Sequence, residues 1–169
     1  SRGRLKYLAV KGRLDQVSRG VYTLPEVWED EFVSIQERYK RGVFALDTAL
    51  FLHDLTDRTP HKFHMAFPYG YNTSSPKAAG ILCSCKKEPY YSLGIALADT
   101  PAGNTVRAYN AEKTLCEILK PISDTDIQII TDAFKRYAGR KDKNIPLLSE
   151  YAHQLRVEKR LRPYLEVLL

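Results

Sequence analysis

The hydrophobic pattern of this 169-residue chain changes once, at Ala111, from short runs to helical stripes. Before this point, short runs rich in β-branched and aromatic residues stand between glycine and proline positions, which predicts strands and short helices joined by turns. After it, apolar residues recur every three or four positions as far as Leu168, which predicts amphipathic helices. This segregated pattern favours an α+β fold over a doubly wound one. We therefore expect a small mixed sheet followed by a C-terminal helical bundle.

Individual elements can be placed from apolar spacing and from glycine or proline stops. The spacing predicts helices over residues 29–40 and 48–55, strands over residues 43–45, 62–67, 81–86, 91–97 and 105–109, and a loop over residues 68–80. In the helical part, Ser123 and Asp126 have the spacing of a capping box, and Asn144 followed by Pro146 predicts another helix start. Cys116 is expected to be a small buried apolar residue.

The first 26 residues combine a basic helix with a hairpin. Helical spacing predicts a helix over residues 1–10 that ends at Gly12, and residues 13–17 and 21–24 predict two strands around a turn at Gly20. In a winged helix-turn-helix, such a helix enters the major groove while the hairpin, or wing, reaches the DNA backbone. The two preceding helices of that motif are absent from the sequence. We therefore interpret residues 1–26 as a truncated winged helix-turn-helix remnant of a longer protein, and residues 27–169 as a second domain.

Basic residues are concentrated at the two ends of the chain. Residues 1–25 carry six basic residues and one acidic residue, and residues 136–169 carry eight basic and four acidic residues. Clustered Lys and Arg bind polyanions, although a charged run also forms an ordinary solvated surface. The C-terminal excess defines a second basic surface, which consists of Arg136, Arg140, Lys141, Lys143, Arg156, Lys159, Arg160 and Arg162.

The sequence offers little for catalysis or metal binding. It contains no glycine-rich phosphate loop, no Gly-x-Ser-x-Gly elbow and no Asp-x-Lys or Glu-x-Lys pair, and Glu112 and Lys113 are adjacent. The best candidate for a metal site is a zinc site, but its paired cysteines usually have two to four residues between them, whereas Cys83 and Cys85 have one. We therefore expect no metal, no cofactor and no enzymatic activity. The residues weighed as zinc ligands are His53, His61, His64, Cys83 and Cys85.

The expected location is the cytoplasm. Three cysteines are an odd set, which suits reduced thiols better than a disulfide framework. The N-terminal residues lead into no signal-peptide pattern, and no apolar run approaches the ~20 residues that cross a bilayer. We therefore expect a protein without a membrane span.

Five segments, in this order, resemble the AbiEi-type abortive-infection antitoxins. They are residues 17–25 (VSRGVYTLP), 45–55 (ALDTALFLHDL), 111–116 (AEKTLC), 148–152 (LSEYA) and 161–166 (LRPYLE). Each segment is weak alone, but their order and spacing are specific, and the resemblance extends over nearly the whole chain.

The resemblance implies an antitoxin of a type IV toxin–antitoxin system. Such a protein counters an AbiEii-type nucleotidyltransferase toxin through its C-terminal domain, with direct contact left open, and represses its operon at inverted repeats in operator DNA. Without the first helices, this chain is expected to bind operator DNA weakly, because a short isolated helix is marginal in water. It is expected to be a monomer in solution. The residues predicted to contact DNA are Arg2, Arg4, Lys6, Tyr7, Lys11, Gln16 and Arg19.

Two other interpretations remain at this point. One is a winged-helix transcriptional regulator whose C-terminal domain senses a ligand in a pocket lined by Tyr69, Tyr71, Tyr90 and Tyr91. The other is an enzyme that acts on the toxin or on nucleic acid. The second basic surface has two competing roles, contact with DNA or contact with the toxin and its tRNA substrate.

Overall fold

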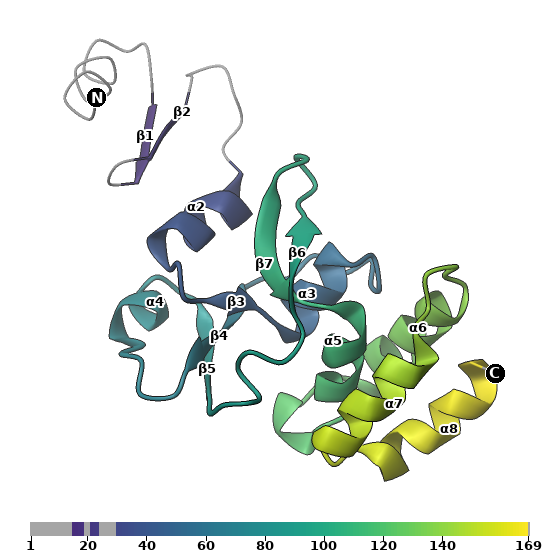
Figure 1. Cartoon of the computed structure of the whole chain (residues 1–169). Helices are drawn as coiled ribbons and strands as arrows, with labels where there is room; N and C mark the ends of the chain where they lie inside the picture. Colours follow the sequence, from purple (N-terminus) through teal and green to yellow (C-terminus); the bar gives the residue numbers. More distant parts are fainter. Residues whose placement is uncertain (1–14, 19–20, 24–29, 169) are drawn as a thin grey trace.

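The structure is a computed structural model that describes residues 15–18, 21–23 and 30–168. Its helices α2–α8 and its five-stranded mixed sheet form an α+β fold, as the change of pattern at Ala111 predicts (Figure 1). The helices are α2 (Glu31–Arg38), α3 (Leu46–Leu52), α4 (Ser74–Ala78), α5 (Ala111–Ile118), α6 (Ile127–Ala138), α7 (Ile145–Gln154) and α8 (Glu158–Leu168), with a 3₁₀ turn η1 (Pro121–Ser123). The strands are β1 (Asp15–Ser18), β2 (Val21–Thr23), β3 (Val43–Phe44), β4 (His64–Pro68), β5 (Leu82–Lys86), β6 (Ile95–Asp99) and β7 (Thr105–Tyr109). None of the described helices is long and apolar enough to cross a membrane.

The sheet has the strand order β5-β4-β3-β7-β6. The strands are mixed in direction: β3 runs parallel to β7 and antiparallel to β4, β4 and β5 run parallel, and β6 and β7 run antiparallel. Although β3 has only two residues, Val43 and Phe44, both are fully buried and hold the centre of the sheet. Strands β5 and β6 form the two edges of the sheet.

Helix α2 lies on the sheet (Figure 1), and aromatic residues pack between them. The carboxylate of Asp30 caps the helix by accepting hydrogen bonds from the backbone amides of Phe32 and Val33, at 3.0 and 3.4 Å. The ring of Phe32 then meets that of Phe44 edge-on at 5.5 Å. This start agrees with the helix predicted over residues 29–40.

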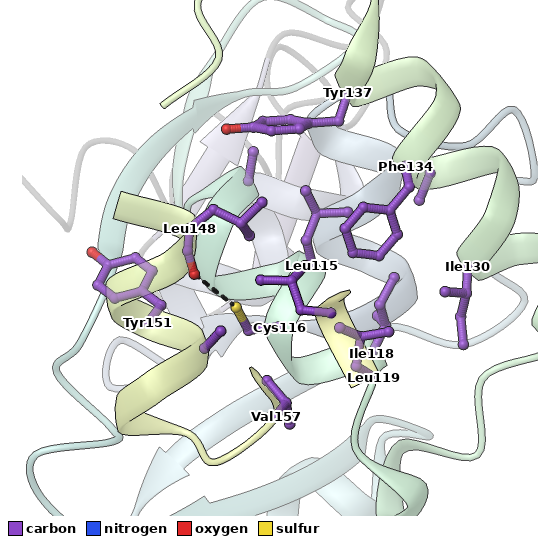
Figure 2. Close-up of a cluster of buried hydrophobic side chains, with 14 of the residues drawn as sticks. Leu115, Cys116, Ile118, Leu119, Ile130, Phe134, Tyr137, Leu148, Tyr151 and Val157 are labelled. Atoms are coloured by element: carbon purple, nitrogen blue, oxygen red, sulfur yellow. Dashed lines mark hydrogen bonds between the residues drawn. The ribbon is translucent and has the colours of Figure 1, made fainter. Parts of the chain in front are cut away.

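Helix α5 connects the sheet to the C-terminal helices. It follows β7 after a single residue, Asn110, whose side chain accepts from the backbone amide of Lys113 at 2.8 Å and so caps the helix. On its far side, Leu115 and Cys116 pack against Leu148 of α7 in the large apolar cluster that Figure 2 shows. Cys116 is fully buried, as expected, and burial raises the pKa of its thiol to about 12.

The structure corrects three local predictions. Residues 68–80 contain the short helix α4, and the strand predicted over residues 91–97 is β6 at Ile95–Asp99, because residues 90–94 form a turn that ends at Gly94 with a φ of +80°. Ser123 is not a helix cap: its hydroxyl donates to the carbonyls of Ile118 and Lys120, while Asp126 caps α6 directly. Asn144 does cap α7, with Pro146 in the first turn.

The predicted N-terminal hairpin is present. Strand β1 pairs antiparallel with β2, with Asp15 opposite Thr23 and Gln16 opposite Tyr22. The helix predicted over residues 1–10 lies outside the described residues, as does the turn residue Gly20.

Candidate functional site

Of the residues predicted to contact DNA, only Gln16 lies in a described element, β1. The other six lie outside the described residues: Arg2, Arg4, Lys6, Tyr7, Lys11 and Arg19. The hairpin itself lies beside α2, at the opposite end of the molecule from α6–α8 (Figure 1). A single nucleic acid that touched both the hairpin and the second basic surface would therefore have to extend along the whole molecule.

The second basic surface is divided into two groups by α7. The first group precedes this helix, at the end of α6 and in the following loop, and the second follows it, at the turn into α8. A ten-residue helix is about 15 Å long, so the two groups lie at opposite ends of that rod. The first group is Arg136, Arg140, Lys141 and Lys143, and the second is Arg156, Lys159, Arg160 and Arg162.

Two arginines of the first group are engaged within the protein. Arg140 forms a bidentate pair with Asp142, with both distances at 2.8 Å, and also donates to the backbone carbonyl of His53 at 3.0 Å. The hydrogen bonds to Arg140 hold the pKa of the Asp142 carboxyl at about 2. Arg136 pairs with Asp132 at 2.8 Å. Changing either arginine would therefore alter the structure as well as the surface charge.

The second group is more available. Arg156, Lys159 and Arg160 are exposed and form no ion pair with any residue in the described part of the chain. They line a hollow of about 460 Å³ at the α7–α8 turn, together with His153 and Glu158, which pair with each other at 2.7 Å. We call Arg156, Lys159, Arg160 and Arg162 the α8 basic group; it is the part of the predicted surface best placed to meet an anionic partner.

The histidines and cysteines do not gather into a metal site. Among the described residues, no three His, Cys, Asp or Glu side chains are grouped closely enough to hold a metal ion. His53 is hydrogen-bonded to the carbonyl of Tyr109 at 2.7 Å, and His64 is hydrogen-bonded to the hydroxyl of Ser84 at 2.7 Å. Cys83 and Cys85 are free thiols on β5, and His61 is exposed.

The four tyrosines suggested for a ligand pocket have separate surroundings. Tyr71 stacks on Phe67 with 4.5 Å between ring centroids, and buried Tyr91 donates to the carbonyl of Arg41 at 2.6 Å. Tyr69 is 70% exposed. These contacts assign packing roles to Tyr71 and Tyr91.

Sequence reasoning missed a buried charged cluster that fastens α5 to β5. Glu117 on α5 is 4% exposed, and it accepts a hydrogen bond from Lys86 on β5 at 2.5 Å. Lys113, one turn earlier, is fully buried and lies 3.4 Å from the other oxygen of Glu117. Its ammonium donates to the carbonyls of Tyr90 and Leu93 at 2.7 and 2.8 Å.

Burial sets the charge states in this cluster. It lowers the pKa of Lys113 to about 8, although attraction to Glu117 acts in the opposite direction. Burial and repulsion from Lys86 lower the pKa of the neighbouring His64 to about 4, so this imidazole is neutral at pH 7. The i,i+4 spacing of Lys113 and Glu117 on an otherwise apolar helix face was the one signal in the sequence that could have revealed the cluster.

No protein-family model matches the chain, and no curated protein matches it. Among solved structures, the chain is similar to the crystal structure of the Rv2827c protein from Mycobacterium tuberculosis, with a TM-score of 0.53 and 15% sequence identity. The similarity covers 97% of this chain and 68% of the mycobacterial one. At this identity the similarity shows a shared fold and nothing about activity.

Proposed function

We propose that the protein is an antitoxin of a type IV toxin–antitoxin system, which neutralises an AbiEii-type nucleotidyltransferase toxin and binds the DNA of its own operon. The α+β domain would carry the antitoxin activity and the N-terminal hairpin would serve as the DNA-binding wing. Neither role requires a catalytic centre in this chain.

The observation that carries the proposal is the ordered series of five segments that resembles the AbiEi-type antitoxins. In the structure these segments fall in different elements: residues 17–25 include the hairpin strand β2, residues 45–55 include α3, and residues 111–116 begin α5. The last two segments lie in α7 and α8. Because they are spread over the whole fold, the resemblance does not rest on one common local motif.

The α8 basic group is the surface that we assign to the partner. Lys159 and Arg160 are exposed at the start of α8, beside the open hollow of about 460 Å³. Exposed cations that have no carboxylate partner keep their full attraction for phosphates or for an acidic protein surface.

Charge reversal at the two ends of α7 tests the proposal and the assignment together. The variant Lys159→Glu/Arg160→Glu changes the α8 basic group, and the matched control Lys141→Glu/Lys143→Glu changes the same number of charges before α7. We expect the first variant to lose either rescue of cells that express the neighbouring toxin gene or binding to operator DNA, and the control to retain both.

The two readouts separate the two roles. Loss of rescue with unchanged DNA binding assigns the α8 basic group to antitoxin activity, and the reverse assigns it to DNA. If both double variants behave like the unchanged protein, the α8 basic group is a solvated surface and its assignment is wrong. If the unchanged protein itself neither rescues growth nor binds operator DNA, the proposed function is wrong.

A further inference from the structure

A cavity of about 500 Å³, lined by both polar and apolar side chains, lies between the edge strand β5, the C-terminal end of α5 and the turn η1. Ser84 and Lys86 reach the cavity from β5, and Glu117 and Lys120 reach it from the end of α5 and the residue that follows. Its volume is in the range of ~300–1,000 Å³ that is usual for small-molecule sites.

The wall of this cavity carries an excess of positive charge. Lys86 and Lys120 line it, the buried Lys113 lies 3.4 Å from Glu117, and Glu117 is the one carboxylate in the lining. Lys86 and Lys113 both approach Glu117, but Lys120 forms no ion pair with a residue in the described ranges. Its ammonium lies 5.8 Å from the ring centre of Tyr90.

Lys120 is also partly desolvated. Burial and repulsion from Lys86 lower its pKa below the usual value for lysine. An anion placed between Lys86 and Lys120 would remove this repulsion, and charge-assisted hydrogen bonds to phosphate oxygens are among the stronger polar contacts in proteins.

The second observation concerns the charge of Glu117. Oε2 of Glu117 accepts from Lys86, and the buried Oε1 lies 3.4 Å from the ammonium of Lys113. Because Oε1 is buried, a ligand in the cavity cannot reach it. The carboxylate is therefore balanced by Lys86 and Lys113, and Lys120 is the cation of the lining whose charge a ligand can neutralise.

We propose that the cavity binds a small phosphorylated molecule with sugar-like hydroxyl groups, whose phosphate lies between Lys86 and Lys120 and whose hydroxyl groups face Ser84. Ser84 and His64, which are hydrogen-bonded to each other at 2.7 Å, form the polar floor under the ligand. Leu46 and the 90% exposed Ile122 form an apolar edge. The site is separate from the α8 basic group and does not depend on the proposed antitoxin function.

Isothermal titration with ribose 5-phosphate, inorganic phosphate and ribose tests the proposal. We expect ribose 5-phosphate to bind more tightly than either component alone. Lys120→Gln should weaken its binding by ~10-fold, which corresponds to the loss of one charge-assisted hydrogen bond. The matched control is Lys87→Gln, since Lys87 is the exposed neighbour of Lys86 and lies over the ring of Tyr69, outside the cavity.

The location of the ligand can be checked independently. Amide chemical-shift changes on adding ribose 5-phosphate should centre on residues 84–86 and 117–123. No binding at millimolar concentration, or an equal loss in Lys120→Gln and Lys87→Gln, would overturn the site. Equal affinity for inorganic phosphate and ribose 5-phosphate would overturn the sugar-like part of the proposed ligand.

Discussion

Because His64 is neutral in the folded protein, we expect acidification to lower the stability of the fold by an amount that can be calculated. The imidazole has a pKa of about 4 in the folded protein and an ordinary value of 6.5 in the unfolded chain. Between these values the unfolded chain binds a proton that the folded protein does not, so acidification favours unfolding. The contribution of His64 to stability is complete above pH 6.5 and is lost as the pH falls towards 4.

The linkage relation gives the size of the effect. With these two pKa values, the free energy of unfolding should fall by about 2 kcal/mol between pH 7.5 and pH 5, and by about 3 kcal/mol between pH 7.5 and pH 4. Other groups titrate in this range too, including His53, whose pKa is also lowered by burial. The matched variant His64→Gln isolates the single contribution, because the amide can still form a hydrogen bond with Ser84 but does not titrate.

Urea unfolding of both proteins at pH 7.5 and pH 5 is the measurement. The free energy of unfolding should fall by about 2 kcal/mol more in the unchanged protein than in His64→Gln. If the two proteins lose the same stability on acidification, then His64 is not held neutral by burial and by Lys86, and the electrostatic account of the cavity is wrong.

Two further predictions concern packing and backbone geometry. Gly94→Ala should lower the free energy of unfolding by about 1–3 kcal/mol, because a Cβ at its φ of +80° would lie 2.7 Å from Cβ of Lys113. The control is Gly70→Ala, whose φ is +87° and whose Cβ would meet no atom within 4 Å. It should cost about 1 kcal/mol in the same thermal or urea unfolding assay. Equal losses would show that no close approach to Lys113 exists. Leu148→Ala should lower the free energy of unfolding by about 3 kcal/mol, since this side chain is fully buried in the C-terminal cluster. The control Leu97→Ala, at a site 71% exposed, should change it by about 0.5 kcal/mol or less. A similar small change for both would contradict the packing shown in Figure 2.

Elements with a local signal could be predicted from the sequence. The hairpin follows from strand-forming residues around Gly20, and α7 follows from the cap at Asn144 and the proline after it. Helix α4 could not be predicted, because Ser74-Ser75-Pro76 has the composition of a turn, and buried Pro76 together with the surrounding tertiary contacts decides its conformation.

The charged cluster shows why sites are harder to predict than elements. Lys86 and Glu117 are 31 residues apart and meet only because β5 forms the edge of the sheet nearest the end of α5. Glu112 and Lys113 are adjacent in sequence, but on helix α5 the partner of Lys113 is Glu117, one turn later. The basic residues between 136 and 162 are likewise close in sequence, but α7 separates them into two groups in the structure.

The most direct test of the proposed antitoxin function is the growth of cells that express the neighbouring toxin gene, with and without this 169-residue chain supplied from a second plasmid. The account predicts that the chain restores growth and that Lys120→Gln, which changes the cavity and not the α8 basic group, restores it equally well. Continued toxicity, despite soluble expression of the folded chain, would contradict the proposed function.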